Sequence, residues 1–233
     1  SKLRMVMQEL FRQARRSRLI IYDPAEGLLL PESVKRSHRP ITKAERRHIL
    51  AVAQNHPAGL WVLTILYTGL RPGETAALFW EDIDFDRNEI HVYKAVESGT
   101  RTIKAPKTPA GIRDIPMRQE LRERLLAVRG EGTAPVFPSA NGGIRSANSL
   151  RRLWNSFAHA LDLHMGAKVR DGQILQHAIA PDLTPYCLRH TFCTDLQRAG
   201  VPINVAKELM GHANISVTAN IYTHRDQKVL HNN

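Results

Sequence analysis

The sequence predicts a mostly α-helical domain with a small antiparallel β-sheet at one edge, an α+β fold. Apolar residues recur at helical spacing through most of residues 41–233, and the spacing becomes strand-like only between residues 83 and 116. Apolar residues make up 42% of the 233 residues, which is enough to build a core. No apolar stretch reaches the length that a membrane-spanning helix needs. We therefore expect one folded main domain over residues 41–233.

Residues 1–40 have a different character. Residues 3–16 have the pattern of a basic amphipathic helix, and residues 31–40 are polar, basic and bounded by prolines, as in a linker. A chain that opens inside a helix and runs on into a linker indicates that a further domain precedes it. We expect residues 1–40 to be the C-terminal remnant of such a domain together with its linker.

The first helices of the main domain have clear boundaries. A capping-box pattern predicts a helix over residues 42–54, and residues 60–68 are apolar nearly all round, which predicts a buried central helix. Gly69 suits the left-handed residue that ends a helix, and Pro72 suits the first turn of the next one. Arg71 is therefore expected on a tight turn between two helices, which is a rigid place for a charge.

The predicted sheet occupies residues 83–116. Its strands are the short apolar runs at residues 90–93, 102–103 and 112–115, which turn residues separate. Helices resume at residues 118–128 and 149–161. Residues 164–181 have no clear pattern and receive no assignment.

Proline and glycine mark the helices of the C-terminal part. Thr184 and Pro185 are expected to open a helix that ends at Gly200. A second helix should run from Pro202 to Gly211. Asn214 or Ser216 is expected to cap a final helix that carries Tyr222.

The chain is strongly basic. It has 33 Lys and Arg against 22 Asp and Glu, which gives a net charge of +11 and a pI near 10.1. A basic excess of this size favours a polyanionic partner, with nucleic acid first and an anionic membrane second. Charge alone leaves a merely basic protein open, but here the basic residues are spread over well-patterned helices rather than gathered in a tail.

The sequence gives no sign of a metal or of an oxidising compartment. Its two cysteines, Cys187 and Cys193, form no CxxC pair, and its 11 histidines show no HExxH or Cys/His ligand spacing. We expect reduced thiols, no metal and no cofactor. No signal peptide opens the chain, so a soluble, cytoplasmic protein is expected.

Four segments resemble the tyrosine recombinases, also called phage integrases. They are TGLRPGE at residues 68–74, APKTPAGIRDIPM at 105–117, TPYCLRHTF at 184–192 and LMGHANISVTANIYTH at 209–224. They follow the family's order across roughly residues 40–224, nearly the whole main domain. The third segment resembles in particular the integrases of bacterial phages and conjugative transposons. The resemblance implies a catalytic domain of that family and, for residues 1–40, the end of its core DNA-binding domain plus the linker.

The resemblance also assigns the reacting groups. It implies that Arg71 and Arg189 clamp a phosphate, a task that suits guanidinium because its planar fork matches two oxygens and stays protonated. It implies that Tyr222 is the nucleophile and that Lys107 is the general acid for the leaving 5′ oxygen. Lys104 lies three residues earlier and remains the alternative proton donor. All four basic residues are also expected to contact DNA.

Four further residues are expected at the site: His212 as a catalytic group, and Glu74, Tyr186 and His190 in support. The resemblance implies that His212 hydrogen-bonds the scissile phosphate and that Glu74 braces the site from behind. His190 is expected to orient the site by hydrogen bonding. The family usually has histidine where this chain has Tyr186, and a phenol is a poorer base than an imidazole. The group that deprotonates Tyr222 therefore stays open between His190 and water.

The resemblance implies that the protein cuts and rejoins double-stranded DNA through a 3′-phosphotyrosine, without metal or ATP, to integrate or excise a mobile element. It also implies a homotetramer on DNA, although the fragment alone is expected to be monomeric. Two alternatives remain: a type IB topoisomerase with the same chemistry, and a non-enzymatic DNA-binding module. The second would not need the two arginines, the lysine and the tyrosine together.

Overall fold

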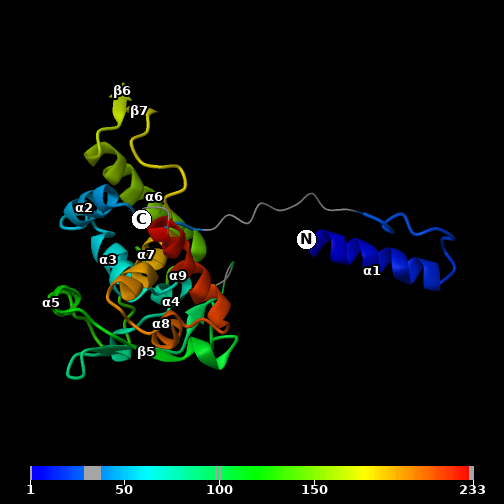
Figure 1. Ribbon diagram of the computed structural model, residues 1–233, viewed down its shortest axis with the longest axis horizontal. Helices are drawn as coiled ribbons and strands as arrows, with labels where there is room; N and C mark the ends of the chain where they lie inside the picture. Colours follow the sequence, from blue (N-terminus) through cyan, green and yellow to red (C-terminus); the bar gives the residue numbers. More distant parts are fainter. Residues whose placement is uncertain (1, 29–37, 98, 100, 231–233) are drawn as a thin grey trace. The chain divides into compact units, whose positions relative to one another are not determined.

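The computed structural model describes residues 2–28, 38–97, 99 and 101–230 (Figure 1). The chain divides into two compact units, Ser1–Ser37 and His38–Asn233. The first unit contains helix α1 (Lys2–Arg16), as the amphipathic pattern predicts, and Arg15 forms an ion pair of 3.7 Å with Glu26 in the loop that follows. The expected linker, residues 31–40, falls largely outside the described residues.

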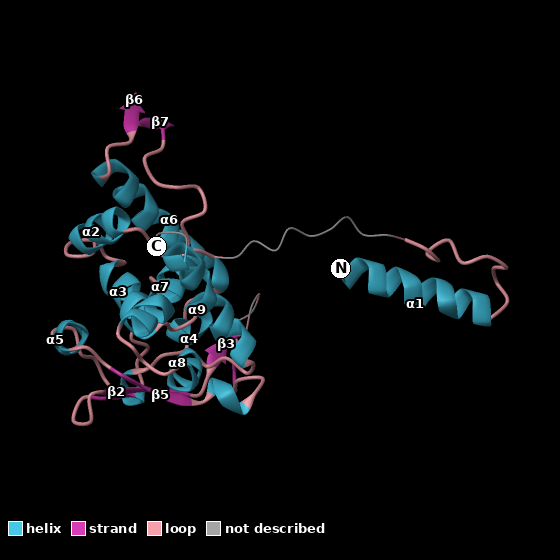
Figure 2. Cartoon of the chain, in the orientation of Figure 1, coloured by secondary structure: helices cyan, strands magenta, loops and turns pink. Residues whose placement is uncertain are grey.

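The second unit is mostly helical (Figure 2). Its helices are α2 (Lys43–Val52), α3 (Gly59–Thr68), α4 (Pro72–Ala76), α5 (Gln119–Leu126), α6 (Ala147–His164), α7 (Pro185–Arg198), α8 (Ile203–Met210) and α9 (Ile215–Leu230). Two short 3₁₀ helices, η1 (Trp80–Asp82) and η2 (Pro109–Gly111), flank the strands. These bounds lie within a few residues of the predicted ones.

The strands form three small antiparallel sheets. The largest has the order β1-β2-β5, from Ile83–Asp84, Glu89–Val92 and Arg113–Pro116. Ile90 pairs with Ile83 on one side and with Ile115 on the other, and all three isoleucines are buried, so one face of this sheet lies on the core. β3 (Ala95–Val96) pairs with β4 (Ile103–Lys104), and β6 (Lys168–Arg170) with β7 (Gln173–Gln176).

The prediction of one sheet over residues 83–116 is therefore wrong in one respect. The β2-β5 ladder ends where Val92 pairs with Arg113, and the chain between these residues leaves the sheet to form the separate β3-β4 hairpin. The unassigned residues 164–181 contain the β6-β7 hairpin, which projects from the end of the unit opposite β2 and β5 (Figure 2). Both strands of that hairpin are largely exposed, which is why they lack the alternating apolar pattern of a half-buried strand.

Helix α3 is the centre of the core, as its composition predicts. Its residues are buried on every side, and α7 and α5 pack against it. The turns at its end are those expected from the sequence. Gly69 adopts φ 65° as the left-handed C-cap, and a Cβ there would lie 2.4 Å from the ring of Phe192. Pro72 opens α4 and leaves Arg71 as its N-cap residue.

The caps of the other helices also follow the sequence, with one exception. Thr42 and Glu45 form the predicted capping box at α2, and the Asn214 side chain accepts a hydrogen bond from the Ser216 amide at the start of α9. Thr184 occupies the N-cap position of α7, but its hydroxyl makes no capping bond. It lies instead 3.4 Å from His38 Nδ1 and 3.5 Å from the Cys187 sulfur.

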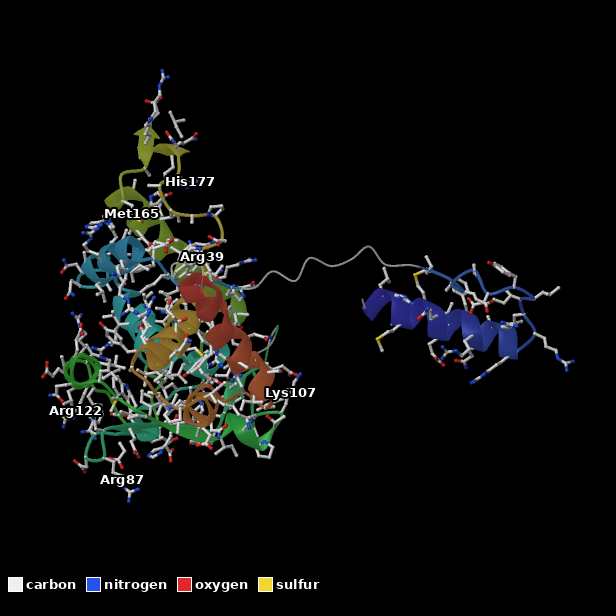
Figure 3. All side chains as sticks on the ribbon, in the orientation of Figure 1. Arg39, Arg87, Lys107, Arg122, Met165 and His177 are labelled. Atoms are coloured by element: carbon white, nitrogen blue, oxygen red, sulfur yellow. The ribbon has the colours of Figure 1, made fainter. Side chains whose placement is uncertain are left out.

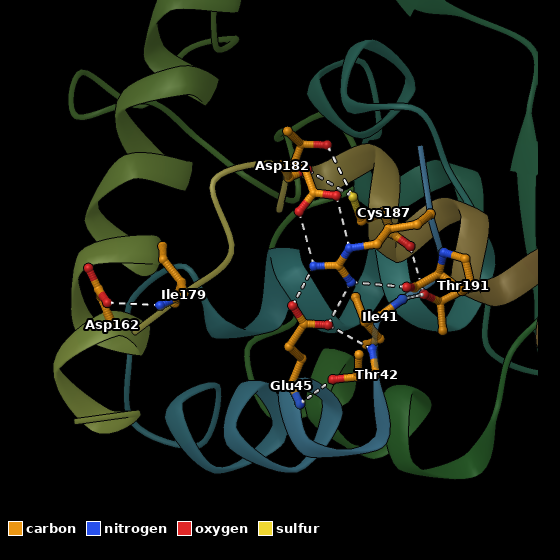
Figure 4. A network of polar contacts seen from close by, with 11 residues as sticks. Ile41, Thr42, Glu45, Asp162, Ile179, Asp182, Cys187 and Thr191 are labelled. Atoms are coloured by element: carbon orange, nitrogen blue, oxygen red, sulfur yellow. Dashed lines mark hydrogen bonds and ion pairs between the residues drawn. The ribbon is translucent and has the colours of Figure 1, made fainter. Parts of the chain in front are cut away.

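A polar network fixes the start of the second unit to α7 (Figure 4). The Arg39 guanidinium donates to both carboxylate oxygens of Glu45, at 2.6 and 2.8 Å, and to Asp182 at 2.9 Å. The Ile41 amide donates to the buried hydroxyl of Thr191 on α7 at 2.8 Å. The Ile41–Thr191 bond holds α7 against the N-terminal part of the unit, whereas Arg39 joins Glu45 on α2 to Asp182 in the segment before α7. Within the described part of the chain, no helix is both long and apolar enough to cross a membrane.

Candidate active site

Arg71 is held by its own helix and by a distant loop. The Glu74 carboxylate accepts hydrogen bonds from the Arg71 backbone amide at 2.8 Å and from its Nη1 at 2.7 Å. Arg71 Nη2 donates to the carbonyl of Gly211 at 2.9 Å. Because the Arg71 side chain keeps 36% of its surface exposed, its guanidinium can still receive a ligand from solvent.

Glu74, which the sequence predicts as a brace behind the site, lies among Arg71, Arg113 and Arg189. Burial opposes its ionisation, but the hydrogen bond and charge of Arg113, together with Arg189 and Arg71, lower the pKa of Glu74 to about 2. The carboxylate is therefore charged at neutral pH, and it orients Arg71 without neutralising the three arginines around it. The cluster keeps a positive excess that favours an anion.

Arg189 lies deeper than Arg71, with 5% of its surface exposed. It is in the first turns of α7, and its guanidinium donates to the carbonyls of Gly69 and Met210. Burial and the like charge of Arg71 lower its pKa to about 9, which still leaves the guanidinium protonated at neutral pH. A buried cation with neutral carbonyls as its hydrogen-bond partners retains its charge for an incoming anion.

The two arginines bond to consecutive carbonyls of one turn. Arg189 bonds to the carbonyl of Met210 and Arg71 bonds to the carbonyl of the next residue, Gly211, at the C-terminal end of α8. Gly211 adopts φ 61° there, and a Cβ would lie 2.8 Å from Arg113 Nη1 and 3.1 Å from the Ala110 carbonyl. The close approach of these groups therefore requires glycine at position 211.

His212 follows this turn and is buried beside the arginines. Its Nδ1 lies 2.9 Å from the hydroxyl of Thr218 on α9. Burial, and then the charges of Arg189 and Arg71, lower its pKa to about 3. The imidazole is therefore neutral at physiological pH, so it can contribute a hydrogen bond to the site but no charge.

A cavity of about 750 Å³ opens beside Arg71. Its walls bring together residues far apart in the sequence, among them Arg71, Lys107, Tyr186, Arg145, Arg151 and Trp154. Lys107, Lys94, Arg145 and Arg151 add further positive charge around its rim, against the carboxylates of Glu74 and Glu97. The cavity is positively charged and large enough for part of a polyanionic ligand.

The two candidate lysines differ in position. Lys107 is exposed and lines the cavity, and Figure 3 shows it at the surface of the unit. Lys104 instead pairs with Glu97 at 2.8 Å. Tyr186 also lines the cavity, with 44% of its surface exposed, and its ring stacks on His38 at a centroid distance of 5.1 Å. Of the two lysines, Lys107 is thus the one beside the arginines.

Tyr222 does not join the cluster in this conformation. Its hydroxyl donates to the carbonyl of Val201, just beyond the C-terminal end of α7, at 3.3 Å, and Gln197 Nε2 donates to the Tyr222 carbonyl at 2.7 Å. Arg189 lies in the first turns of the same helix and bonds instead to the carbonyls of Gly69 and Met210. Burial and the nearby Cys193 thiol raise the pKa of the phenol.

His190, a further residue of the predicted site, is half-buried on α7. Its carbonyl accepts a hydrogen bond from the Thr194 hydroxyl at 3.1 Å. Among the described residues, no group of three or more His, Cys, Asp or Glu side chains could hold a metal ion.

Arg113 belongs to the cluster of arginines around Glu74, but the sequence reasoning missed it. The available signal was an arginine on a strand next to buried isoleucines, a position that needs a buried acid as partner.

Fold and site together describe a helical domain that gathers three arginines and a neutral histidine around Glu74 and the turn after α8, beside a basic cavity. The chain belongs to the phage integrase family, whose model matches residues 39–228. This confirms the resemblance that the four sequence segments indicate.

Individual relatives agree with the family. A XerC-like tyrosine recombinase of Caldanaerobacter subterraneus is 29% identical over 204 residues, which are 83% of this chain and 52% of that protein. The transposase of transposon Tn916 from Enterococcus faecalis is 30% identical over 166 residues, 70% of this chain and 41% of the transposase. The chain thus spans about half the length of these curated relatives.

Solved structures confirm the fold. The Tn1549 transposon integrase in complex with circular intermediate DNA matches with a TM-score of 0.73 and 24% identity, over 97% of this chain and 78% of that one. A lambda integrase dimer bound to a COC′ core site matches with a TM-score of 0.61 and 18% identity, over 94% of this chain and 57% of that one. The predicted fold class, a mostly helical tyrosine recombinase catalytic domain, is therefore confirmed.

Proposed function

We propose that this chain is the catalytic part of a site-specific DNA recombinase that integrates or excises a mobile element through a 3′-phosphotyrosine intermediate. The observation that carries the proposal is the convergence of Arg71 and Arg189 on the consecutive carbonyls of Met210 and Gly211. Family membership supports the same reading, and relatives that cover most of this chain are recombinases and transposases by name.

In the proposed reaction, the Tyr222 oxygen attacks the scissile phosphorus and forms a phosphotyrosine bond. The bond from phosphorus to the 5′ oxygen breaks, and Lys107 gives that oxygen a proton. Arg71 and Arg189 stabilise the charge that develops on the non-bridging oxygens, where removal of one such donor typically costs roughly 10²–10³ in rate. His212 donates a neutral hydrogen bond to the same phosphate. The proton of Tyr222 passes to His190 or to water.

The rejoining step is the reverse of cleavage. A 5′-hydroxyl from another strand attacks the phosphotyrosine and gives its proton to Lys107. The bond from phosphorus to Tyr222 breaks, and the phenol takes back the proton that His190 or water had accepted. Because the covalent link preserves the energy of the broken phosphodiester, exchange needs no ATP. Arg71 and Arg189 supply the positive charge that a divalent metal would otherwise bring to the phosphate. We propose double-stranded DNA as the partner and a homotetramer as the active assembly. The basic excess of +11 supports the first part of this proposal.

The cleavage step can be tested by trapping the intermediate. Nicked duplexes with a randomised core let the short 5′-hydroxyl fragment diffuse away, so a covalent adduct should accumulate and run slowly on a denaturing gel. The wild-type chain should give an adduct, and Tyr222→Phe should give none because it lacks the attacking oxygen. Tyr22→Phe, at a tyrosine that is 70% exposed, is the matched control and should react like the wild type.

An equal adduct from Tyr222→Phe would eliminate this nucleophile. Relaxation of supercoiled plasmid without any strand exchange would favour the topoisomerase alternative. DNA binding without an adduct in any arm would favour the non-enzymatic module.

A further inference from the structure

Arg113 is a buried arginine with four hydrogen bonds and no direct place in the proposed chemistry. It begins β5, and its side chain is 4% exposed. Its Nη2 donates to Glu74 Oε2 at 2.8 Å and its Nη1 to Glu74 Oε1 at 3.2 Å. Its Nε donates to the carbonyl of Leu209 at 2.8 Å, and Nη1 also approaches the carbonyl of Gly111 at 3.2 Å.

These contacts connect Arg113 to both phosphate-binding arginines. Arg113 forms a bidentate ion pair with Glu74. Glu74 in turn accepts hydrogen bonds from the backbone amide and Nη1 of Arg71 and so orients Arg71. Leu209, which accepts from Arg113 Nε, directly precedes Met210 and Gly211, whose carbonyls hold Arg189 and Arg71. One guanidinium therefore fixes the acid on one side of the site and the turn on the other.

Arg113 also reaches the lysine turn. Its bond to the Gly111 carbonyl anchors the end of η2, the 3₁₀ turn that follows Lys107 and Thr108. The fork also lies close to the main chain at residue 211, where an added Cβ would lie 2.8 Å from Arg113 Nη1. Three segments of the site, α4, the turn after α8 and the lysine turn, thus meet at one side chain.

We propose that Arg113 is a positioning residue for phosphate cleavage, and this inference rests on the function proposed above. Its planar fork sets the orientation of Glu74 and of the turn at residues 209–212, and through them the placement of Arg71, Arg189 and His212 around the phosphate. The geometry of the fork matters here as well as its charge, since a lysine cannot bond Glu74 twice and Leu209 at the same time. A group that acts only as a stabilising ion pair would affect folding without affecting how the site handles charge.

Two substitutions distinguish a positioning role of Arg113 from a purely stabilising one. Arg113→Lys keeps the charge and removes the fork, and Arg113→Met removes both. If Arg113→Met does not fold, Arg113→Gln, which keeps an amide donor for Glu74, takes its place. The matched control is Arg39→Met, because Arg39 also grips a buried glutamate, Glu45, with two hydrogen bonds but lies outside the cavity. Thermal unfolding identifies the temperature at which every variant is folded.

The first readout is the cleavage rate on two nicked duplexes. Both have a sequence that forms the covalent adduct in the trapping experiment, and they differ only in a phosphate or a methylphosphonate at the scissile position. The methylphosphonate lacks one negative charge, so it depends less on well-placed arginines. Misplacement of a reacting group by about 1 Å can cost ~10²-fold in rate. Both Arg113→Lys and Arg113→Met should lose about that factor on the phosphate and much less on the methylphosphonate. Arg39→Met should change both rates equally.

The second readout needs no cleavage. Tungstate mimics phosphate, and its affinity for each folded chain can be measured by calorimetry. Arg113→Lys should bind tungstate at least ~10-fold more weakly than the wild type, and Arg39→Met should bind it equally well. If the wild type binds tungstate with this dependence but never cleaves DNA, the proposed function fails and the role of Arg113 stands.

Two outcomes would overturn the inference. One is a folded Arg113→Lys variant with wild-type tungstate affinity and an unchanged ratio of the two cleavage rates, which would show that charge alone matters. The other is a wild-type chain that binds no tungstate, because Arg113 would then have no anion site to organise.

Discussion

At the scale of single residues, the site is built from side chains that hold each other in place. Arg71, Arg113 and Arg189 surround Glu74, the one carboxylate among them, and its low pKa of about 2 keeps it charged at neutral pH. Three cations against one anion leave two positive charges, which would stabilise the negative charge that a phosphodiester develops in the proposed in-line reaction. The neutral His212 adds directionality without further repulsion.

Lys107 is expected to be the proton donor, because it lines the cavity beside Arg71 and Lys104 does not. Lys107→Ala should slow cleavage by roughly 10²–10⁴, the usual contribution of a general acid. A substrate with sulfur in place of the leaving 5′ oxygen should restore the rate, because a thiolate leaves without protonation. Trapped-adduct kinetics on the two substrates measure both effects.

Lys104→Ala provides the comparison, since Lys104 already pairs with Glu97 at 2.8 Å. It should weaken DNA binding slightly and leave the cleavage step of bound DNA unchanged. If sulfur substitution rescues Lys104→Ala rather than Lys107→Ala, the assignment of the acid must be exchanged.

At the scale of secondary-structure elements, the position of α9 decides whether Tyr222 can take the role proposed for it. It packs on α7 and α8, and it keeps the Tyr222 hydroxyl on the carbonyl of Val201 instead of beside the arginines. The other members of the site lie on α4, α7 and the turn after α8, which are tied together by the hydrogen bonds of Arg71 and Arg189. If Tyr222 is the nucleophile, as proposed above, its attack requires α9 to move while the rest stays fixed.

Gln197→Ala should make that movement easier. Gln197 donates to the Tyr222 carbonyl at 2.7 Å, and one hydrogen bond contributes about 0.5–1.5 kcal/mol, so the undocked population of α9 should rise ~2–10-fold. Adduct formation should accelerate by a similar factor, and hydrogen exchange at the α9 amides should increase. Gln119→Ala, at an exposed glutamine on α5, should do neither. Faster exchange together with slower cleavage would mean that the docked position of α9 is already the productive one.

At the scale of the whole molecule, burial of charge and of imidazole at the site makes folding stability depend on pH. His212 has a folded pKa of about 3 against an ordinary 6.5, so the unfolded chain binds a proton first as the pH falls. Stability is therefore lost below pH 6.5. The folded pKa of Glu74 is about 2 against 4.5, so its contribution is present above pH 4.5 and is lost only below it.

His212→Gln should therefore flatten the pH dependence between pH 6.5 and 4.5. Each group shifted in this way contributes at most about 1.4 kcal/mol per pH unit to the free energy of unfolding. His56, whose pKa burial also lowers, should keep part of the slope. Urea denaturation at several pH values measures the slope of the free energy of unfolding against pH. His159→Gln, at an exposed histidine, should retain the full slope, and equal slopes in both variants would contradict the buried neutral state of His212.

The sequence predicted most of the fold because the signals for helix boundaries are local. Glycine at positions 69 and 211 and proline at positions 72 and 185 act through backbone sterics within a few residues, and all four appear where the pattern places them. The β6-β7 hairpin escaped prediction because its exposed strands carry no burial pattern. The separation of β3 and β4 from the main sheet depends on strand pairing, which local sequence does not specify.

By itself, the sequence determined which side chains are present, that Arg71 is held on a helix-to-helix turn, and that the chain resembles the phage integrases. The tertiary structure decided which groups meet. It brought Arg113 to Glu74 and Leu209, placed Lys107 rather than Lys104 at the cavity, and kept Tyr222 away from the arginines. Local patterns follow from the backbone within a few residues, whereas these contacts depend on how helices and strands distant in the chain pack around a shared core.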